Sequence, residues 1–121
     1  MTFQELGLRQ EILDAVAELG FVNPMPVQEQ VIPYMLTHDN DLVALAQTGT
    51  GKTAAFGLPI LNMVNVEQRK IQSLVLAPTR ELCIQIANDI KNFASKMRGV
   101  KVVPVYGGES IVSQYKQLDI Q

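Results

Sequence analysis

The segment between residues 42 and 53 restricts the fold of this chain more than any other. Residues 42–46 (LVALA) form a continuous apolar run, which is typical of a central strand buried on both faces. A glycine-containing loop follows at 47–51, and helical spacing begins at Lys52. A buried strand, a glycine-rich loop and a helix in this order are the context of a phosphate-binding loop. Taken alone, the segment also fits a purely structural glycine-rich turn.

Helical and strand-like patterns alternate along the rest of the chain. Apolar spacing, glycines and prolines predict helices over 8–19, over 27–36 with a break or kink at Pro33, from 52 through 61 with a bend at Pro59, over 81–97 and over 111–118. Further apolar runs predict strands at 73–77 and 101–106. This alternation predicts an α/β fold with a parallel sheet flanked by helices. In such sheets, ligands bind beyond the carboxyl ends of the strands.

Composition excludes several classes of protein. The chain of 121 residues is 47% hydrophobic and 18% charged, which fits a globular domain and not a disordered one. No apolar run approaches the ~20 residues of a membrane span, and the first residues lack the pattern of a secretory signal. We therefore expect no membrane association. The single cysteine, Cys83, excludes an internal disulfide and fits a reducing compartment, so we expect a cytoplasmic location.

Charge is distributed unevenly. Residues 1–50 carry seven acidic side chains and one basic one, a sum of −6, whereas residues 51–121 carry nine basic and five acidic side chains, a sum of +4. An anionic partner would therefore meet the second part of the chain. Chance asymmetry on solvated faces explains the same numbers equally well.

The loop at 47–53 has the chemistry that a triphosphate needs. Gly49 and Gly51 permit backbone angles that let successive N–H groups point inward and bind an anion. The following helix N-terminus adds about half a positive elementary charge. Lys52 can reach the β- and γ-phosphates, and the Thr53 hydroxyl can bind Mg²⁺.

Gln28 and two upstream phenylalanines form a second constellation. The Gln28 amide offers a donor and an acceptor side by side, which matches the N7 and N6 positions of adenine and not guanine. The ring of Phe3 or Phe21 can stack on a base. The alternatives are a solvated helix residue for Gln28 and a core anchor for Phe3.

Two further motifs follow predicted strands. In Pro78-Thr79-Arg80-Glu81-Leu82, Thr79 is a natural helix N-cap, and Arg80 beside a helix N-terminus can hold a phosphate. Gly107-Gly108 would let a nucleic-acid backbone approach closely. A plain cap with an exposed arginine and an ordinary tight turn are the alternatives.

These segments occur in the order and spacing of one family. Residues 20–28, 46–53, 78–82 and 107–108 resemble the Q motif, motif I, motif Ia and the GG motif of the DEAD-box RNA helicases. The similarity covers essentially the whole chain. It implies an incomplete P-loop NTPase (RecA-like) domain, with residues 1–38 as the Q-motif region and residues 39–121 as the P-loop core.

The resemblance also implies roles for individual residues. ATP and Mg²⁺ would be the cofactors, and the RNA sugar-phosphate backbone, contacted independently of sequence, would be the partner. Gln28 would read adenine beside Phe3 or Phe21. The phosphates would be held by Gln47, Thr48, Gly49, Thr50, Gly51, Lys52 and Thr53, of which Lys52 and Thr53 would be catalytic. RNA would be contacted by Thr79, Arg80 and Gly108.

The sequence also departs from the family. The Asp-Glu-Ala-Asp motif on the Walker B strand, the Ser-Ala-Thr motif and the second RecA-like domain are absent, so we expect a fragment of a longer helicase that alone hydrolyses ATP negligibly. The competing interpretation is a catalytically inactive fragment that binds adenine nucleotide or another protein. A different P-loop class, such as a small-molecule kinase, is disfavoured by Gln28 and residues 78–82. Residues 97–108 resemble the bacterial cold-shock and ribosome-assembly branch, which implies ribosome-assembly or RNA-decay proteins as partners.

Overall fold

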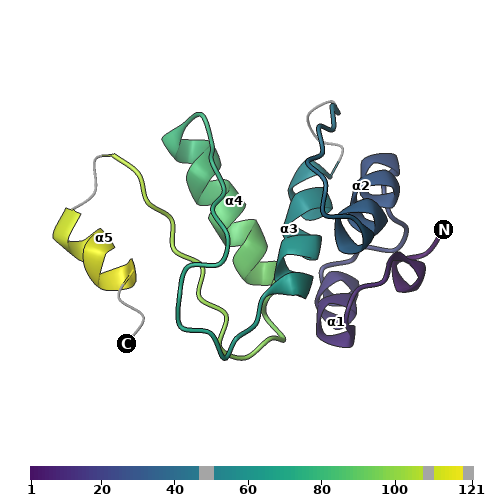
Figure 1. Cartoon of the computed structure of the whole chain (residues 1–121), viewed down its shortest axis with the longest axis horizontal. Helices are drawn as coiled ribbons and strands as arrows, with labels where there is room; N and C mark the ends of the chain where they lie inside the picture. Colours follow the sequence, from purple (N-terminus) through teal and green to yellow (C-terminus); the bar gives the residue numbers. More distant parts are fainter. Residues whose placement is uncertain (47–50, 108–110, 119–121) are drawn as a thin grey trace.

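Helices make up all the regular structure in the described part of the chain. The computed structural model describes residues 1–46, 51–107 and 111–118. Figure 1 shows α5 set apart from the other helices at the end of a long irregular segment. The elements in chain order are the 3₁₀ helix η1 (Phe3–Leu6) and the α-helices α1 (Gln10–Glu18), α2 (Pro26–Thr37), α3 (Lys52–Met63), α4 (Arg80–Phe93) and α5 (Ile111–Leu118).

The ends of the first two α-helices are set by a contact with α3 and by local signals at Gly20 and Pro26. Before α1, the backbone N–H of Arg9 donates to the side-chain oxygen of Asn62 at 2.7 Å, which ties α1 to α3. After α1, Gly20 adopts a φ of +89°, a left-handed conformation that glycine accepts readily. Helix α2 begins with Pro26, whose missing N–H costs nothing at the first helical position. Pro33 lies inside α2 without interrupting it, so the predicted break is wrong.

The later helices also lie where the pattern predicts them, with shifted ends. Helix α3 continues past Pro59 to Met63. Helix α4 ends at Phe93, so the predicted extension to residue 97 is wrong, whereas α5 has the predicted bounds. No helix within the described ranges is long and apolar enough to cross a membrane.

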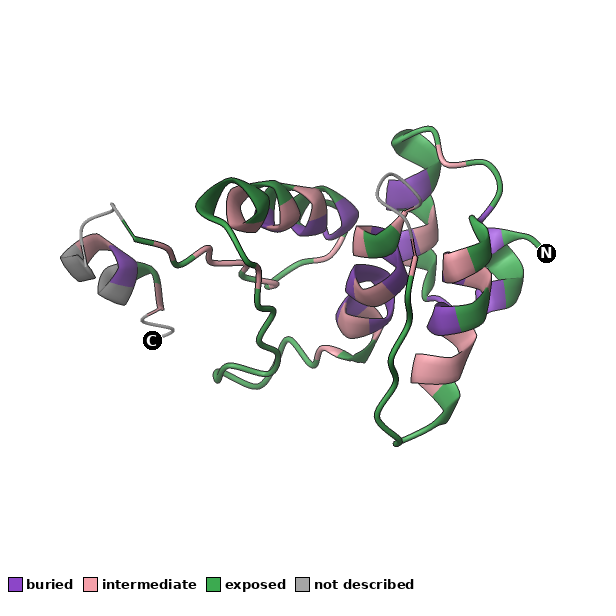
Figure 2. Cartoon of the chain, turned by 90° about the horizontal axis from the view of Figure 1, so that it is seen from above, coloured by how far each residue is buried: buried purple, intermediate pink, exposed green. Residues whose placement is uncertain are grey.

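The core lies around α3, which packs against α2, α4 and α1. Figure 2 shows buried residues on the facing sides of these helices and exposed residues along the connecting segments. The ring of Phe21 joins elements of the core, since its centroid lies 6.1 Å from that of Phe3 and 6.0 Å from that of Phe93. The buried cluster consists of Phe3, Leu6, Leu8, Ile12, Val16, Ile32, Ala54, Leu58, Leu61, Ile90, Phe93 and Ala94.

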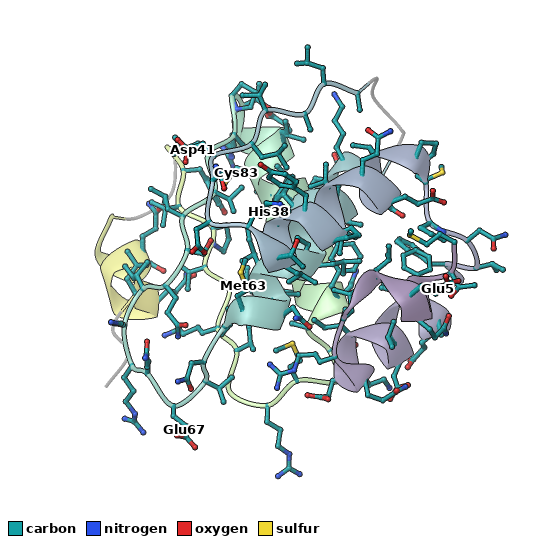
Figure 3. All side chains as sticks on the ribbon, turned by 45° about the vertical axis from the view of Figure 1, so that its right-hand side comes forward. Glu5, His38, Asp41, Met63, Glu67 and Cys83 are labelled. Carbon is teal, nitrogen blue, oxygen red and sulfur yellow. The ribbon has the colours of Figure 1, made fainter. Side chains whose placement is uncertain are left out.

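The connection between α3 and α4 is an exposed loop followed by an irregular segment. Gln72 closes the loop, because its side-chain oxygen accepts from the N–H of Asn65 at 2.9 Å and its amide donates to the carbonyl of Asn65 at 2.7 Å. Figure 3 shows Glu67 at the tip of this loop, pointing away from the helices. The loop therefore returns the chain toward α4 without joining the core.

The three predicted strands are not formed. Residues 42–46, 73–77 and 101–106 are irregular, and within the described residues no backbone hydrogen bond pairs one of them with another. The prediction that the first two are buried is also wrong, since Val43 is 86% exposed and Leu76 is 84% exposed. The physical reason is that a strand is stabilised by hydrogen bonds to a neighbour, and in the part of the chain that the structure describes these segments have no neighbouring strand to pair with.

Candidate nucleotide and RNA-contact site

The N-terminus of α3 forms the described half of the candidate phosphate loop. Gly51 adopts a φ of +81°, a left-handed conformation that other residues avoid, and the helix begins at the next residue, Lys52. Lys52 is exposed and Thr53 half-buried. The described residues provide no side-chain cap at Gly51 and no acidic residue in the first turn. This helix end therefore keeps its positive partial charge, as an anion site requires.

The rest of the predicted loop lies outside the described residues. These positions are Gln47, Thr48, Gly49 and Thr50. Their roles stay predictions.

Gln28 is one of the buried polar residues of the structure, with 2% of its surface exposed. Its side-chain oxygen accepts from the backbone N–H of Met25 at 2.9 Å, and its Nε2 donates to the carbonyl of Gly51 at 3.3 Å. The alternative that Gln28 is a solvated helix residue is therefore wrong. The amide joins the start of α2 to the last residue of the candidate phosphate loop.

The contact between Gln28 and Gly51 disfavours a side chain at position 51. A Cβ at residue 51 would lie 2.3 Å from Nε2 of Gln28 and 3.3 Å from Cγ of Met25. The positive φ independently disfavours a side chain. The glycine is visible in the sequence, but its contact with Gln28 of α2 is not.

Phe3 lies in the core, with 3% of its surface exposed, and its ring is tilted by 42° to that of Phe21. This arrangement favours the core-anchor interpretation of Phe3, because a base can stack only on an uncovered ring face. Phe21 is half-buried between Phe3 and Phe93. Sequence reasoning missed the link to Phe93, for which the available signal is an aromatic residue within the helix predicted over 81–97.

The predicted helix cap at Thr79 is confirmed. Its hydroxyl oxygen accepts from the backbone N–H of Leu82 at 3.1 Å. Arg80, the first residue of α4, is exposed, and its guanidinium carbon lies 5.2 Å from the ring centroid of Tyr106. Gly107 is exposed, whereas the predicted RNA contact Gly108 lies outside the described residues. The structure thus brings motif 78–82 and the segment before the two glycines together.

Sequence reasoning missed Tyr106. The signal that was available is an aromatic residue directly before Gly107-Gly108.

Metal ligands are sparse in the described part of the chain. It contains no group of three or more His, Cys, Asp or Glu side chains placed to hold a metal ion. Thr53, at the start of α3, is the residue that sequence reasoning assigned to Mg²⁺. A single protein oxygen fits this ion when phosphates and water complete its coordination.

Comparison with known proteins decides the family. The family model described as "DEAD/DEAH box helicase" matches residues 25–121, which is most of the chain. The chain belongs to the DEAD/DEAH box helicase family. The resemblance drawn from the four sequence motifs is thereby confirmed.

The name of one curated relative of this DEAD/DEAH box chain states its activity. The chain is 48% identical over 117 residues to "DEAD-box ATP-dependent RNA helicase CshA" of Geobacillus kaustophilus (strain HTA426), an alignment that covers 97% of the chain and 25% of the relative. The chain thus spans about a quarter of that relative's length.

Solved structures give the same result. A DEAD box protein from the hyperthermophile Methanococcus jannaschii superposes with a TM-score of 0.93 at 40% identity, covering 99% of this chain and 32% of that chain. S. cerevisiae Dbp5 bound to RNA and ADP BeF₃ superposes with a TM-score of 0.78 at 34% identity, covering 91% and 29%. These matches confirm the predicted fold class, an incomplete RecA-like P-loop domain, although its strands are not paired here.

Proposed function

We propose that this chain provides the ATP-binding site and part of the RNA-contact surface of an ATP-dependent RNA helicase. In this proposal it is the N-terminal part of the first RecA-like domain, with residues 1–38 as the Q-motif region and residues 39–121 as the P-loop core. The observation that carries the proposal is the hydrogen bond from Gln28 to Gly51. It joins a glutamine suited to adenine to the loop suited to phosphates, a pairing that a generic phosphate loop does not need.

Phosphate binding is the task of the α3 N-terminus. The backbone N–H groups of the first turn and the helix dipole favour an anion there, and Lys52 adds a full positive charge. The start of the helix fits a phosphate because Gly51, which has no side chain, adopts the left-handed φ directly before the first helical N–H groups. Thr53 would hold Mg²⁺ through its hydroxyl oxygen, and the ion would neutralise charge on the phosphates during transfer.

Adenine recognition is the task of Gln28. A glutamine amide has two N–H donors and an oxygen with two acceptor lone pairs. The contact with Met25 uses one lone pair of the oxygen, and the contact with Gly51 uses one N–H donor. One donor and one acceptor therefore remain for N7 and N6 of adenine. Because the side chain is 2% exposed, the residues that cover it would have to move to admit the base.

RNA contact is the task of the α4 N-terminus and the glycine pair. Thr79, Arg80 and Gly108 would contact the sugar-phosphate backbone, which positions RNA without reading its sequence. The structure of Dbp5 bound to RNA and ADP BeF₃ supports this role, because this chain superposes on that protein. Ribosome-assembly or RNA-decay proteins would be further partners. A cytoplasmic location agrees with the free thiol of Cys83.

A nucleotide-selectivity measurement tests the proposal. Calorimetric titration with Mg-ATP and Mg-GTP should show preferential binding of ATP, and Gln28→Ala should remove that preference because the amide is lost. Gln30→Ala is the matched control, because Gln30 is an exposed glutamine of the same helix. Equal affinity for ATP and GTP in the unchanged protein would refute adenine recognition, and a chain that binds neither nucleotide would refute the whole proposal.

The 121 residues by themselves should bind nucleotide without turning it over. Phosphoryl transfer needs carboxylates that hold Mg²⁺ and position the attacking water, and the described residues contain no acidic cluster placed to hold a metal ion. We expect a steady-state ATPase assay of the chain with RNA to remain at background. Turnover comparable to that of a complete helicase would contradict this expectation.

A further inference from the structure

Tyr106 and Arg80 form a contact that the proposed function does not use. Arg80 is the exposed first residue of α4, and its guanidinium carbon lies 5.2 Å from the centroid of the Tyr106 ring. This distance is within the ~6 Å at which a cation is attracted to the face of an aromatic ring. Arg80 lies in the segment that resembles motif Ia, and Tyr106 directly precedes Gly107-Gly108, which resemble the GG motif.

The backbone around Tyr106 is anchored on both sides. The N–H of Tyr106 donates to the side-chain oxygen of Gln114 at 2.8 Å, and Gln114 is itself buried, with 7% exposed. The preceding carbonyl, that of Val105, accepts from Sγ of Cys83 at 3.7 Å, within the first turns of α4. The ring is therefore carried by backbone that α4 and α5 hold in place.

A ring under a guanidinium leaves the donors of the arginine available. The five N–H donors of arginine lie in the plane of the guanidinium, whereas an aromatic ring contacts its flat face. An arginine that lies over a tyrosine can therefore still donate two parallel hydrogen bonds to a phosphate. The ring also restricts the rotamers of the long side chain, so less conformational freedom is lost when RNA binds.

We propose that Tyr106 is a positioning residue that holds the Arg80 guanidinium over its ring and presents it to an RNA phosphate. This proposal rests on the proposed function, because it assigns Arg80 to RNA contact. Tyr106 acts through Arg80 and needs no contact of its own with RNA. The contribution of the ring to Arg80 is set by its aromatic face and not by the tyrosine hydroxyl.

RNA affinity of the complete protein that contains this chain tests the proposal. Fluorescence anisotropy with labelled single-stranded oligouridine, in the presence of ADP and beryllium fluoride, would compare Tyr106→Leu, Tyr106→Phe and Arg80→Ala. We expect Tyr106→Leu to weaken RNA binding about 2- to 5-fold, the range of an exposed cation–π contact. Tyr106→Phe should stay within about 2-fold of the unchanged protein, since phenylalanine keeps the ring.

A double-mutant cycle separates positioning from direct contact. In Arg80→Ala, the further change Tyr106→Leu should cost nothing, because the ring has no guanidinium left to hold. The same loss in both backgrounds would overturn the proposal, as would a Tyr106→Phe variant as weak as Tyr106→Leu. Lys91→Ala is the charge control, since Lys91 is an exposed cation in the last turn of α4, and it should bind RNA normally.

Two further measurements keep the test decisive. If Tyr106→Leu lowers the melting temperature, Tyr106→Trp replaces it as the deciding variant: a tryptophan face should hold Arg80 at least as well, and weakened RNA binding would overturn the proposal. Fluorescent ATP binding, measured on the same variants, should not change. RNA binding that is unaffected by Arg80→Ala would overturn this proposal while leaving ATP recognition by Gln28 standing.

Discussion

Nε2 of Gln28 donates to the backbone carbonyl of Gly51 at 3.3 Å, across 23 residues of sequence. The bond joins α2 to the residue directly before α3. Because Gly51 is also the last residue of the candidate phosphate loop, the position of the loop depends on the packing of α2. Nucleotide affinity and the stability of this helix pair should therefore change together when either residue is substituted.

Gly51→Ala should destabilise the chain and weaken ATP binding. The left-handed φ of +81° costs a side chain about 1–2 kcal/mol. The new Cβ would also displace the Gln28 amide and lose a hydrogen bond worth about 1 kcal/mol. Urea unfolding should therefore show a loss of about 2–3 kcal/mol. Gly20→Ala is the control, because Gly20 has a similar φ with nothing within 4 Å of its Cβ position. Equal losses in the two variants would contradict the role of the contact.

Leu58→Ala should cost more stability than any change on the surface. Leu58 lies in α3 at 0% exposure, within the buried cluster. Truncating a leucine in such a place leaves a cavity and costs about 2–5 kcal/mol. Val43→Ala is the apolar control, since Val43 is 86% exposed, and it should change the unfolding free energy by less than about 0.5 kcal/mol. Similar losses in both variants would show that the core is not centred on α3.

Helices were predictable from the sequence because their signals are local. Apolar spacing, the glycine after α1 and the Thr79 cap all act within one or two turns. The error at the end of α4 has a clear cause. Met97 continues the apolar stripe and packs against the core, but it does so from a turn in which its N–H donates to the carbonyl of Ala94 at 2.9 Å. Apolar periodicity indicates which side chains face the core, and residues in a turn can follow the same spacing as residues in a helix.

Strands and tertiary contacts were harder to predict from the sequence than helices. The runs at 42–46 and 73–77 are apolar enough for a central sheet, but burial of a strand depends on neighbours far away in sequence. The described residues pair neither run with another segment. For the same reason, the contacts of Gln28 with Gly51 and of Arg80 with Tyr106 emerged only from the structure, because each joins residues far apart in sequence.

Thr79→Ala should destabilise α4. The threonine hydroxyl accepts from the N–H of Leu82 at 3.1 Å, and losing such a cap costs about 1 kcal/mol. Thr79→Ser keeps the hydroxyl and should unfold at nearly the same urea concentration as the unchanged chain. If the two variants were equally destabilised, the methyl group of Thr79 would matter and the cap would not.

The ion pair between Lys96 and Glu18 should make stability depend on alkaline pH. The hydrogen bond and charge of Glu18 raise the pKa of Lys96 above its usual value of 10.5. A raised folded-state pKa means that the contribution is fully present below the usual pKa and is lost as pH rises through the folded-state value. The difference in unfolding free energy between the unchanged chain and Lys96→Met should therefore be constant up to about pH 10 and shrink above it. Lys70→Met, in the exposed loop after α3, should show no such difference, and a Lys96 effect that grew with pH would refute the assignment.

The isolated chain should associate through its unpaired apolar segments. Val43 is 86% exposed and Leu45 is 94% exposed, and two residues apart they would share one face of a strand. Long exposed apolar segments with unpaired backbone groups template pairing with other chains. Sedimentation velocity should therefore show a molecular weight that rises with concentration. The double change Val43→Lys with Leu45→Lys should shift the chain toward monomer, because lysines on a strand oppose edge pairing. Gln85→Lys with Asn92→Lys adds the same charge to exposed positions of α4 and should leave association unchanged. If both double variants reduced association equally, net charge would be the cause and the role of residues 42–46 would be refuted.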